Sequence, residues 1–122
     1  MTDQCRPRLL YIDDDVGFAR LVSRRLDTLG FDVTVAAEGS EGLAHLQGQH
    51  FDVIVLDHYM PGLSGEQTLA RIVALTEPPP VVYVTASDEC QVAVAALKAR
   101  AADYVIKDMS AGFFELLAAI LT

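Results

Sequence analysis

The sequence predicts an α/β protein built around a parallel β-sheet. Short apolar runs alternate five times with longer stretches of helical periodicity, within a length of 122 residues that suits one domain. Two of the runs, 53–56 and 81–84, are continuously apolar. Such runs are typical of strands that helices cover on both faces, so we expect helices on both sides of the sheet.

The expected strands are 9–12, 31–36, 51–56, 81–84 and 102–106. The run 31–36 alternates apolar and polar residues, which indicates that only one of its faces is well buried. We therefore place this strand at an edge of the sheet.

The expected helices have recognisable ends. The first carries its apolar residues at helical spacing and ends at Gly30, which suits a left-handed C-terminal position. The third begins at Ser64 and cannot pass the three prolines 78–80. The fourth begins at Asp88 with a capping-box pattern, and the fifth runs from Ser110 to the end.

Composition restricts the possible partners. The chain has 9 basic and 17 acidic residues, a net charge of −8. This argues against a nucleic-acid surface on this domain and against binding to anionic membranes. Cys5 and Cys90 do not make a disulfide framework or a zinc site. The chain start lacks an apolar signal core, so we expect a cytoplasmic, soluble domain with residues 1–7 flexible.

Polar residues follow the expected strands where each one ends. Asp13 and Asp14 follow the first strand, Asp57 the third, Thr85 the fourth and Lys107 the fifth. The carboxyl ends of parallel strands lie along one edge, and ligands of open α/β sheets bind there. If the first and third strands are neighbours, the three carboxylates meet, with a hydroxyl and an ammonium approaching from the other side.

Three carboxylates in one crevice repel one another, and a cation among them relieves the repulsion. All-oxygen ligands with room for water favour Mg²⁺ over zinc. Asp15 instead suits a helix N-terminus, where an acidic side chain is stabilised by the dipole. The histidines 45, 50 and 58 do not cluster in the sequence. His58 adjoins Asp57, but consecutive strand residues point in opposite directions, which disfavours a catalytic role.

Four segments together carry a family resemblance: YIDDD, VIVLDHYMPGLSG, VVYVTAS and ADYVIK. In this order and at these distances they make nearly the whole chain resemble the receiver domain of two-component response regulators. The resemblance implies one receiver domain over 1–122, with a flavodoxin-like (βα)5 fold and strand order 2-1-3-4-5.

The resemblance also implies a phosphorylation site. Asp57 matches the residue that accepts a phosphoryl group from a histidine kinase or phosphotransfer protein. Asp14 matches a direct ligand of Mg²⁺, and Asp13 matches one that acts through water. The backbone carbonyl of Tyr59 matches the third protein ligand. The domain would catalyse only its own phosphorylation and dephosphorylation, and would not be an enzyme in the usual sense.

Further residues match the parts that read the phosphoryl group. Thr85 and Lys107 match the residues that bind its oxygens, and Tyr104 matches the aromatic residue that reorients on activation. Tyr59 also stands at the mouth of the site, as does Ser87, so both could control access of water.

The implied output surface comprises the helix after Asp88, the strand 102–106 and the C-terminal helix. In that last helix Phe114, Ala118 and Leu121 form a second apolar stripe, expected to be partly exposed and available for a partner or a homodimer. Two positions depart from the family. Asp108 follows Lys107 where a proline is usual, and we expect a trans bond.

The second departure is Arg100, which stands where many relatives have a glycine that ends the fourth helix, so we expect a shifted helix end.

Three other readings of the whole chain remain open. A pseudo-receiver would bind partners without phosphorylation. A phosphatase with an aspartate nucleophile could use the acid triplet 13–15, but the spacing to Thr85 and Lys107 argues against it. A flavodoxin-like electron carrier needs a phosphate loop where this acid triplet stands.

Overall fold

The computed structural model describes residues 6–58, 62–85 and 100–106, together with residues 115, 119 and 121. These residues form a five-stranded sheet in the order β2-β1-β3-β4-β5, with all neighbouring strands parallel. The fold class and strand order predicted above are confirmed, and the strand expected at an edge, β2, is there. The strands are β1 (Arg8–Ile12), β2 (Asp32–Ala36), β3 (Val53–Asp57), β4 (Val81–Thr85) and β5 (Asp103–Ile106).

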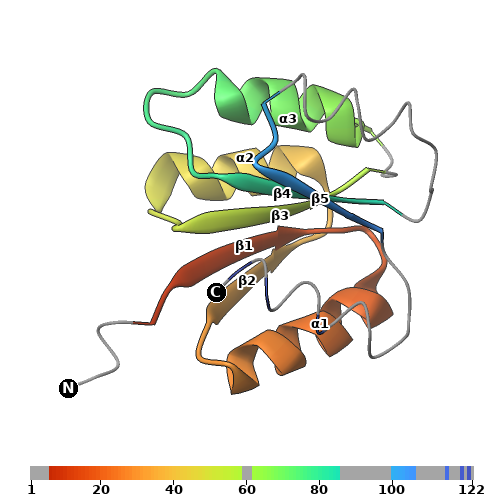
Figure 1. The fold of residues 1–122 in the computed structure, drawn as a ribbon. Coiled ribbons are helices and arrows are strands. Elements are labelled where there is room, and N and C mark those ends of the chain that lie inside the picture. Colours follow the sequence, from red (N-terminus) through yellow and green to blue (C-terminus); the bar gives the residue numbers. More distant parts are fainter. Residues whose placement is uncertain are drawn as a thin grey trace.

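Helices cover both faces of the sheet. Helix α1 (Val16–Thr28) lies on one face, and α2 (Gly39–Gly48) and α3 (Gly65–Val73) lie on the other (Figure 1). The helix expected to begin at Asp88 falls outside the described residues.

The ends of α1 and α3 follow from their capping residues. The Asp15 carboxylate accepts a hydrogen bond from the Phe18 N–H at 3.0 Å, as its place before the helix predicts. Gly30, with a φ of 101°, follows the end of α1. Ser64 and Gln67 form a capping box at the start of α3.

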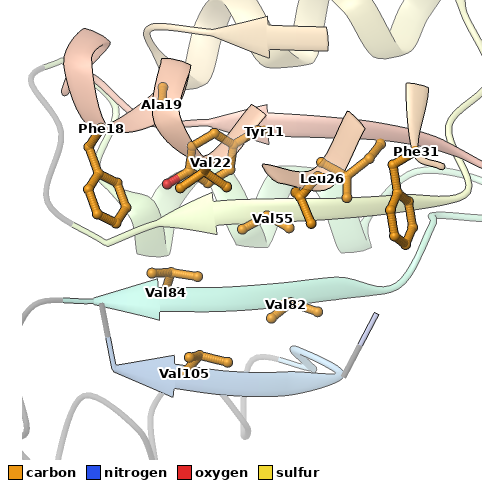
Figure 2. Packing of buried hydrophobic residues seen from close by; sticks show 11 residues of the cluster. Tyr11, Phe18, Ala19, Val22, Leu26, Phe31, Val55, Val82, Val84 and Val105 are labelled. Carbon is orange, nitrogen blue, oxygen red and sulfur yellow. The ribbon is translucent and has the colours of Figure 1, made fainter. Parts of the chain in front are cut away.

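The apolar residues form two clusters, one on each face of the sheet. Figure 2 shows the first, in which Phe18, Val22 and Leu26 of α1 pack over the sheet residues Tyr11 and Val55. The second cluster lies under α2 and α3 and consists of Leu10, Ile12, Ala36, Phe51, Ile54, Leu56, Leu69, Ile72, Val81, Tyr83 and Ala101. Alternation along β3 therefore directs residue 55 towards α1 and residues 54 and 56 towards α3.

Two expectations concern the ends of the chain. Of residues 1–7, expected to be flexible, 1–5 lie outside the described residues, and the Arg6 guanidinium donates to the Asp27 carboxylate at 2.7 Å and to the Phe31 carbonyl at 2.6 Å. Leu121, expected on a partly exposed stripe, is half-buried and packs against the first cluster. Phe114 and Ala118 of that stripe are not among the described residues.

Arg100 has a φ of 77°, in the left-handed region that favours glycine. The end of the preceding helix, which was expected to be shifted, falls outside the described residues. Glu77, immediately before Pro78, also has a positive φ, of 70°. Among the described helices, none is long and apolar enough to span a bilayer.

Candidate functional site

Asp13 is a buried, hydrogen-bonded carboxylate at the carboxyl edge of the sheet. Its side chain is buried, with 1% of the residue exposed. Its two oxygens accept hydrogen bonds from the Tyr11 hydroxyl at 2.8 Å and from the Asp15 N–H at 3.0 Å. The Asp13 N–H donates to the Ala36 carbonyl of β2 at 3.0 Å, which fixes the backbone where the chain leaves β1. The carboxylate is therefore held in one orientation before any ligand binds.

Tyr11 supplies the hydroxyl that holds Asp13. Burial raises the pKa of the Tyr11 phenol far above its usual range, and the charge of Asp13 raises it further. The phenol consequently stays protonated and donates to the carboxylate at any ordinary pH. The sequence analysis overlooked this contact, although alternation places residues 11 and 13 on the same face of the strand.

Asp13, Asp14 and Asp57 meet at the carboxyl ends of β1 and β3, as their positions predict. One carboxylate oxygen from each lies within 4.8 Å of the others. Asp13 and Asp57 are buried, at 1% and 3% exposure, whereas Asp14 is exposed to solvent. Three carboxylate oxygens with one side open to water suit a hard divalent cation such as Mg²⁺, which retains several waters when bound. This is the only such cluster among the described residues.

The expected phosphoryl-binding residues are described only in part. Thr85 is fully buried at the end of β4, one residue beyond Val84, the register partner of Asp57. Tyr104 belongs to β5 and pairs with Tyr83, but its side chain is not described. Tyr59, Ser87 and Lys107, with the Lys107–Asp108 bond, lie outside the described residues.

The residue after Asp57 enters a second polar contact. His58 Nδ1 and the Tyr83 hydroxyl are hydrogen-bonded at 2.5 Å, and the two rings meet edge to face with centroids 5.5 Å apart. Sequence reasoning missed this pair because the contact depends on the register of β3 against β4. Neither His45 nor His50 belongs to this contact. His50 pairs with Asp52, just before the start of β3 at the other end of the strands.

Gly65, the first residue of α3, lies against the strand end that carries Asp57. A Cβ at this position would lie 2.6 Å from the Asp57 carbonyl oxygen, the His58 Cα and the Tyr83 hydroxyl. Glycine is therefore required here because α3 approaches the end of β3 closely. Gly62, before α3, has a φ of 73°, which also favours glycine.

The protein is thus a doubly wound α/β domain. At the carboxyl ends of its central strands it carries an acidic site whose oxygens suit a divalent cation. Comparison with known families is consistent with that class. Residues 9–120 match the family model of the response regulator receiver domain. The chain therefore belongs to the receiver domain family of two-component response regulators.

Individual relatives agree with this assignment. The transcriptional regulatory protein ZraR of Salmonella typhimurium is 36% identical over 101 residues, which make up 83% of this chain and 23% of ZraR. The chain thus spans less than a quarter of the length of that relative.

Solved structures give the same result. A receiver domain of a Francisella response regulator has a TM-score of 0.85 and 31% identity, covering 95% of this chain and 94% of that one. A Burkholderia pseudomallei response regulator has a TM-score of 0.84 and 27% identity, covering 95% of this chain and 66% of its own. That structure contains a phosphorylated aspartic acid, a calcium ion and citrate.

Proposed function

We propose that this domain accepts a phosphoryl group on the Asp57 carboxylate from a phosphohistidine of a kinase or phosphotransfer protein. One observation carries the proposal: Asp57 is buried at the end of the central strand β3, in a cluster with Asp13 and Asp14. The phosphorylated aspartic acid and the divalent ion of the Burkholderia relative support it. The net charge of −8 favours a protein partner over nucleic acid, and we place the reaction in the cytoplasm.

In this reaction an Asp57 oxygen attacks the phosphorus atom. The P–N bond of the phosphohistidine breaks, its electron pair stays on the imidazole, and an acyl phosphate forms on Asp57. Water later cleaves that acyl phosphate and releases inorganic phosphate. The domain returns to its starting state, so it acts as a timed switch and catalyses only its own modification.

Asp13, Asp14 and Asp57, with the Tyr59 carbonyl, would hold Mg²⁺. When bound, the ion neutralises charge on the phosphoryl oxygens. Asp13 contributes a carboxylate whose orientation Tyr11 and the Asp15 N–H already fix. The exposed Asp14 leaves one side of the cluster open to the donor.

The remaining roles rest on the resemblance. Thr85 and Lys107 would bind the phosphoryl oxygens, and Tyr104 would reorient when Thr85 moves. Tyr59 and Ser87 would limit access of water to the acyl phosphate. The repacking would change the surface formed by the helix after residue 88, β5 and the C-terminal helix, and a partner or a second copy that prefers one arrangement would shift the population.

Intact-protein mass spectrometry tests the assignment. In the presence of Mg²⁺ and a small acyl-phosphate donor, wild type should gain about 80 Da, the mass of one phosphoryl group. Asp57→Asn should gain nothing. Asp52→Asn is the matched control, since it removes the same charge at the opposite edge of the sheet, and it should be modified like wild type. Modification of Asp57→Asn would show that another residue accepts the group.

Thermal melts test the cation site separately. Millimolar Mg²⁺ should raise the melting temperature of wild type, because an ion that binds only the folded state stabilises it. Asp14→Ala should lose most of that gain. An equal gain in both proteins would place the ion elsewhere.

A further inference from the structure

The backbone at the phosphoacceptor is held from the side of the sheet opposite its carboxylate. Asp57 lies on the same face of β3 as Val55, which belongs to the first core cluster under α1. Leu56 and Tyr83 belong to the second cluster, under α3, and Tyr83 contacts the ring of His58. The His58 ring therefore lies on the α3 side of the strand end, where it contacts Tyr83.

Four contacts converge on the Asp57–His58 segment. The His58 N–H donates to the Val84 carbonyl at 2.8 Å, and the Gly65 N–H donates to the His58 carbonyl at 3.0 Å. The His58 ring is hydrogen-bonded to the Tyr83 hydroxyl. The α-carbon of Gly65 packs so closely that no side chain fits between it, the Asp57 carbonyl and that hydroxyl. The segment is thus tied to β4 and to α3 at the residue that follows the phosphoacceptor.

The hydrogen bond between His58 and Tyr83 is the one side-chain contact in this set. Tyr83 is fully buried in β4, which lies between β3 and β5, so its hydroxyl has little freedom to move. Two backbone hydrogen bonds, from the His58 N–H to the Val84 carbonyl and from the Gly65 N–H to the His58 carbonyl, fix the path of the chain beyond β3. The bond between His58 and Tyr83 adds a restraint through side chains on the α3 face.

We propose that His58 and Tyr83 are positioning residues for the phosphoacceptor: their hydrogen bond sets the orientation in which Asp57 meets Asp13 and Asp14. The proposal rests on the function proposed above for Asp57. It predicts that breaking the bond changes cation binding and phosphoryl transfer, although neither side chain touches the cation or the phosphoryl group.

Three substitutions isolate the bond. Tyr83→Phe removes only the hydroxyl. His58→Leu removes the ring nitrogens, whereas His58→Asn keeps a polar group near the position of Nδ1 and should restore part of the contact. Thr68→Val is the matched control. It also removes one buried hydroxyl hydrogen bond, from Thr68 Oγ1 to the Ser64 carbonyl at 2.8 Å, but within α3 and away from Asp57.

Two readouts are compared, the second of them at a temperature well below the melting temperature of every variant. The first is the Mg²⁺ concentration at half of the maximal thermal stabilisation, which needs no phosphorylation. The second is the rate of modification by the acyl-phosphate donor, separated into its maximal value and its donor dependence. Tyr83→Phe and His58→Leu should each raise the Mg²⁺ midpoint and lower the maximal rate about tenfold, the lower end of the effect of removing a group that orients a ligand.

The double variant should lose little more than either single one, because both break the same bond. His58→Asn should lie between wild type and His58→Leu. Thr68→Val should lower the melting temperature but leave both readouts as in wild type.

The inference is overturned if Tyr83→Phe melts earlier while its Mg²⁺ midpoint and maximal rate match wild type, since the bond would then be purely structural. The same conclusion follows if Thr68→Val shifts the readouts equally. Should Tyr83→Phe fail to fold, His58→Leu against His58→Asn decides the matter. Failure of the proposed function is a different result: wild type would not be phosphorylated at Asp57, while the Mg²⁺ midpoints would still report on positioning.

Discussion

Replacement of Gly65 by alanine should destabilise the domain, although alanine is the better helix former. Gly65 is the first residue of α3. In a helix interior, alanine is more favourable than glycine by up to about 1 kcal/mol. A Cβ there would lie 2.6 Å from the Asp57 carbonyl oxygen, the His58 Cα and the Tyr83 hydroxyl. Two of these three atoms belong to the backbone, so no rotation of a side chain can relieve the overlap.

The expected cost follows from that overlap. Non-bonded heavy atoms separate to about 3.5 Å at the least, so the helix start or the end of β3 must move by roughly 0.9 Å. Overpacking of this kind costs about 1–3 kcal/mol. After the smaller propensity gain, the net loss should be about 1–2 kcal/mol, which corresponds to a fall in melting temperature of about 3–10 °C in a domain of this size.

Urea unfolding at neutral pH measures the loss as a shift in midpoint at constant slope. Gly17→Ala is the matched control, since Gly17 also lies in the first turn of a helix and its new Cβ would meet only the Asp15 Oδ1 at 3.8 Å. That variant should be unchanged or slightly more stable. If Gly65→Ala is as stable as Gly17→Ala, the close approach of α3 to the end of β3 is not a constraint, and the argument for the glycine fails.

Three smaller predictions concern other parts of the fold. Arg100→Gly should raise stability by about 1 kcal/mol in urea unfolding, because it relieves a left-handed arginine; no change would mean the conformation carries no strain. Tyr11→Phe should lower stability by about 1.5–3 kcal/mol at pH 7, since it removes a hydrogen bond to the buried Asp13 carboxylate; an Asp13→Asn background should shrink the loss. The hydrogen bond from the Arg8 N–H lowers the pKa of the Asp52 carboxyl. The stabilisation from this bond is therefore present above the ordinary aspartate pKa and is lost as the pH falls through the lowered pKa. The urea midpoints of wild type and Asp52→Asn should differ at pH 7 and converge in strong acid.

Much of the acidic site followed from the sequence because it depends on where strands end. Asp13 and Asp57 each follow a run of apolar residues, and the carboxyl ends of parallel strands share one edge. Their meeting needs only that β1 and β3 are neighbours. That adjacency came from the family resemblance, since strand order is a property of the whole topology that no local pattern encodes.

The contacts that hold the site could not be predicted in the same way. Tyr83 reaches His58 only because Leu56 pairs with Tyr83 in the register of β3 against β4. Register is set by packing of both faces at once, so it is invisible in either strand alone. The left-handed backbone of Arg100 could not be predicted for a related reason. Its local cost disfavours the conformation, and the surrounding fold imposes it nevertheless.

The acidic residues and the contacts that hold the strand end beneath them lie on opposite faces of the sheet. Asp13, Tyr11 and Asp57 lie on the α1 face, where under the proposed function burial and charge would decide how a cation and a phosphoryl group are bound. His58, Tyr83 and Gly65 meet at the α3 face, where the His58 ring is bonded to the Tyr83 hydroxyl and Gly65 approaches the Asp57 carbonyl. Because one strand end carries both sets, a substitution on the α3 face can change the geometry of the carboxylates without altering their number or charge. Variation at positions 58 and 83 is therefore a route by which related domains could tune the lifetime or rate of phosphorylation while keeping the acidic cluster itself intact.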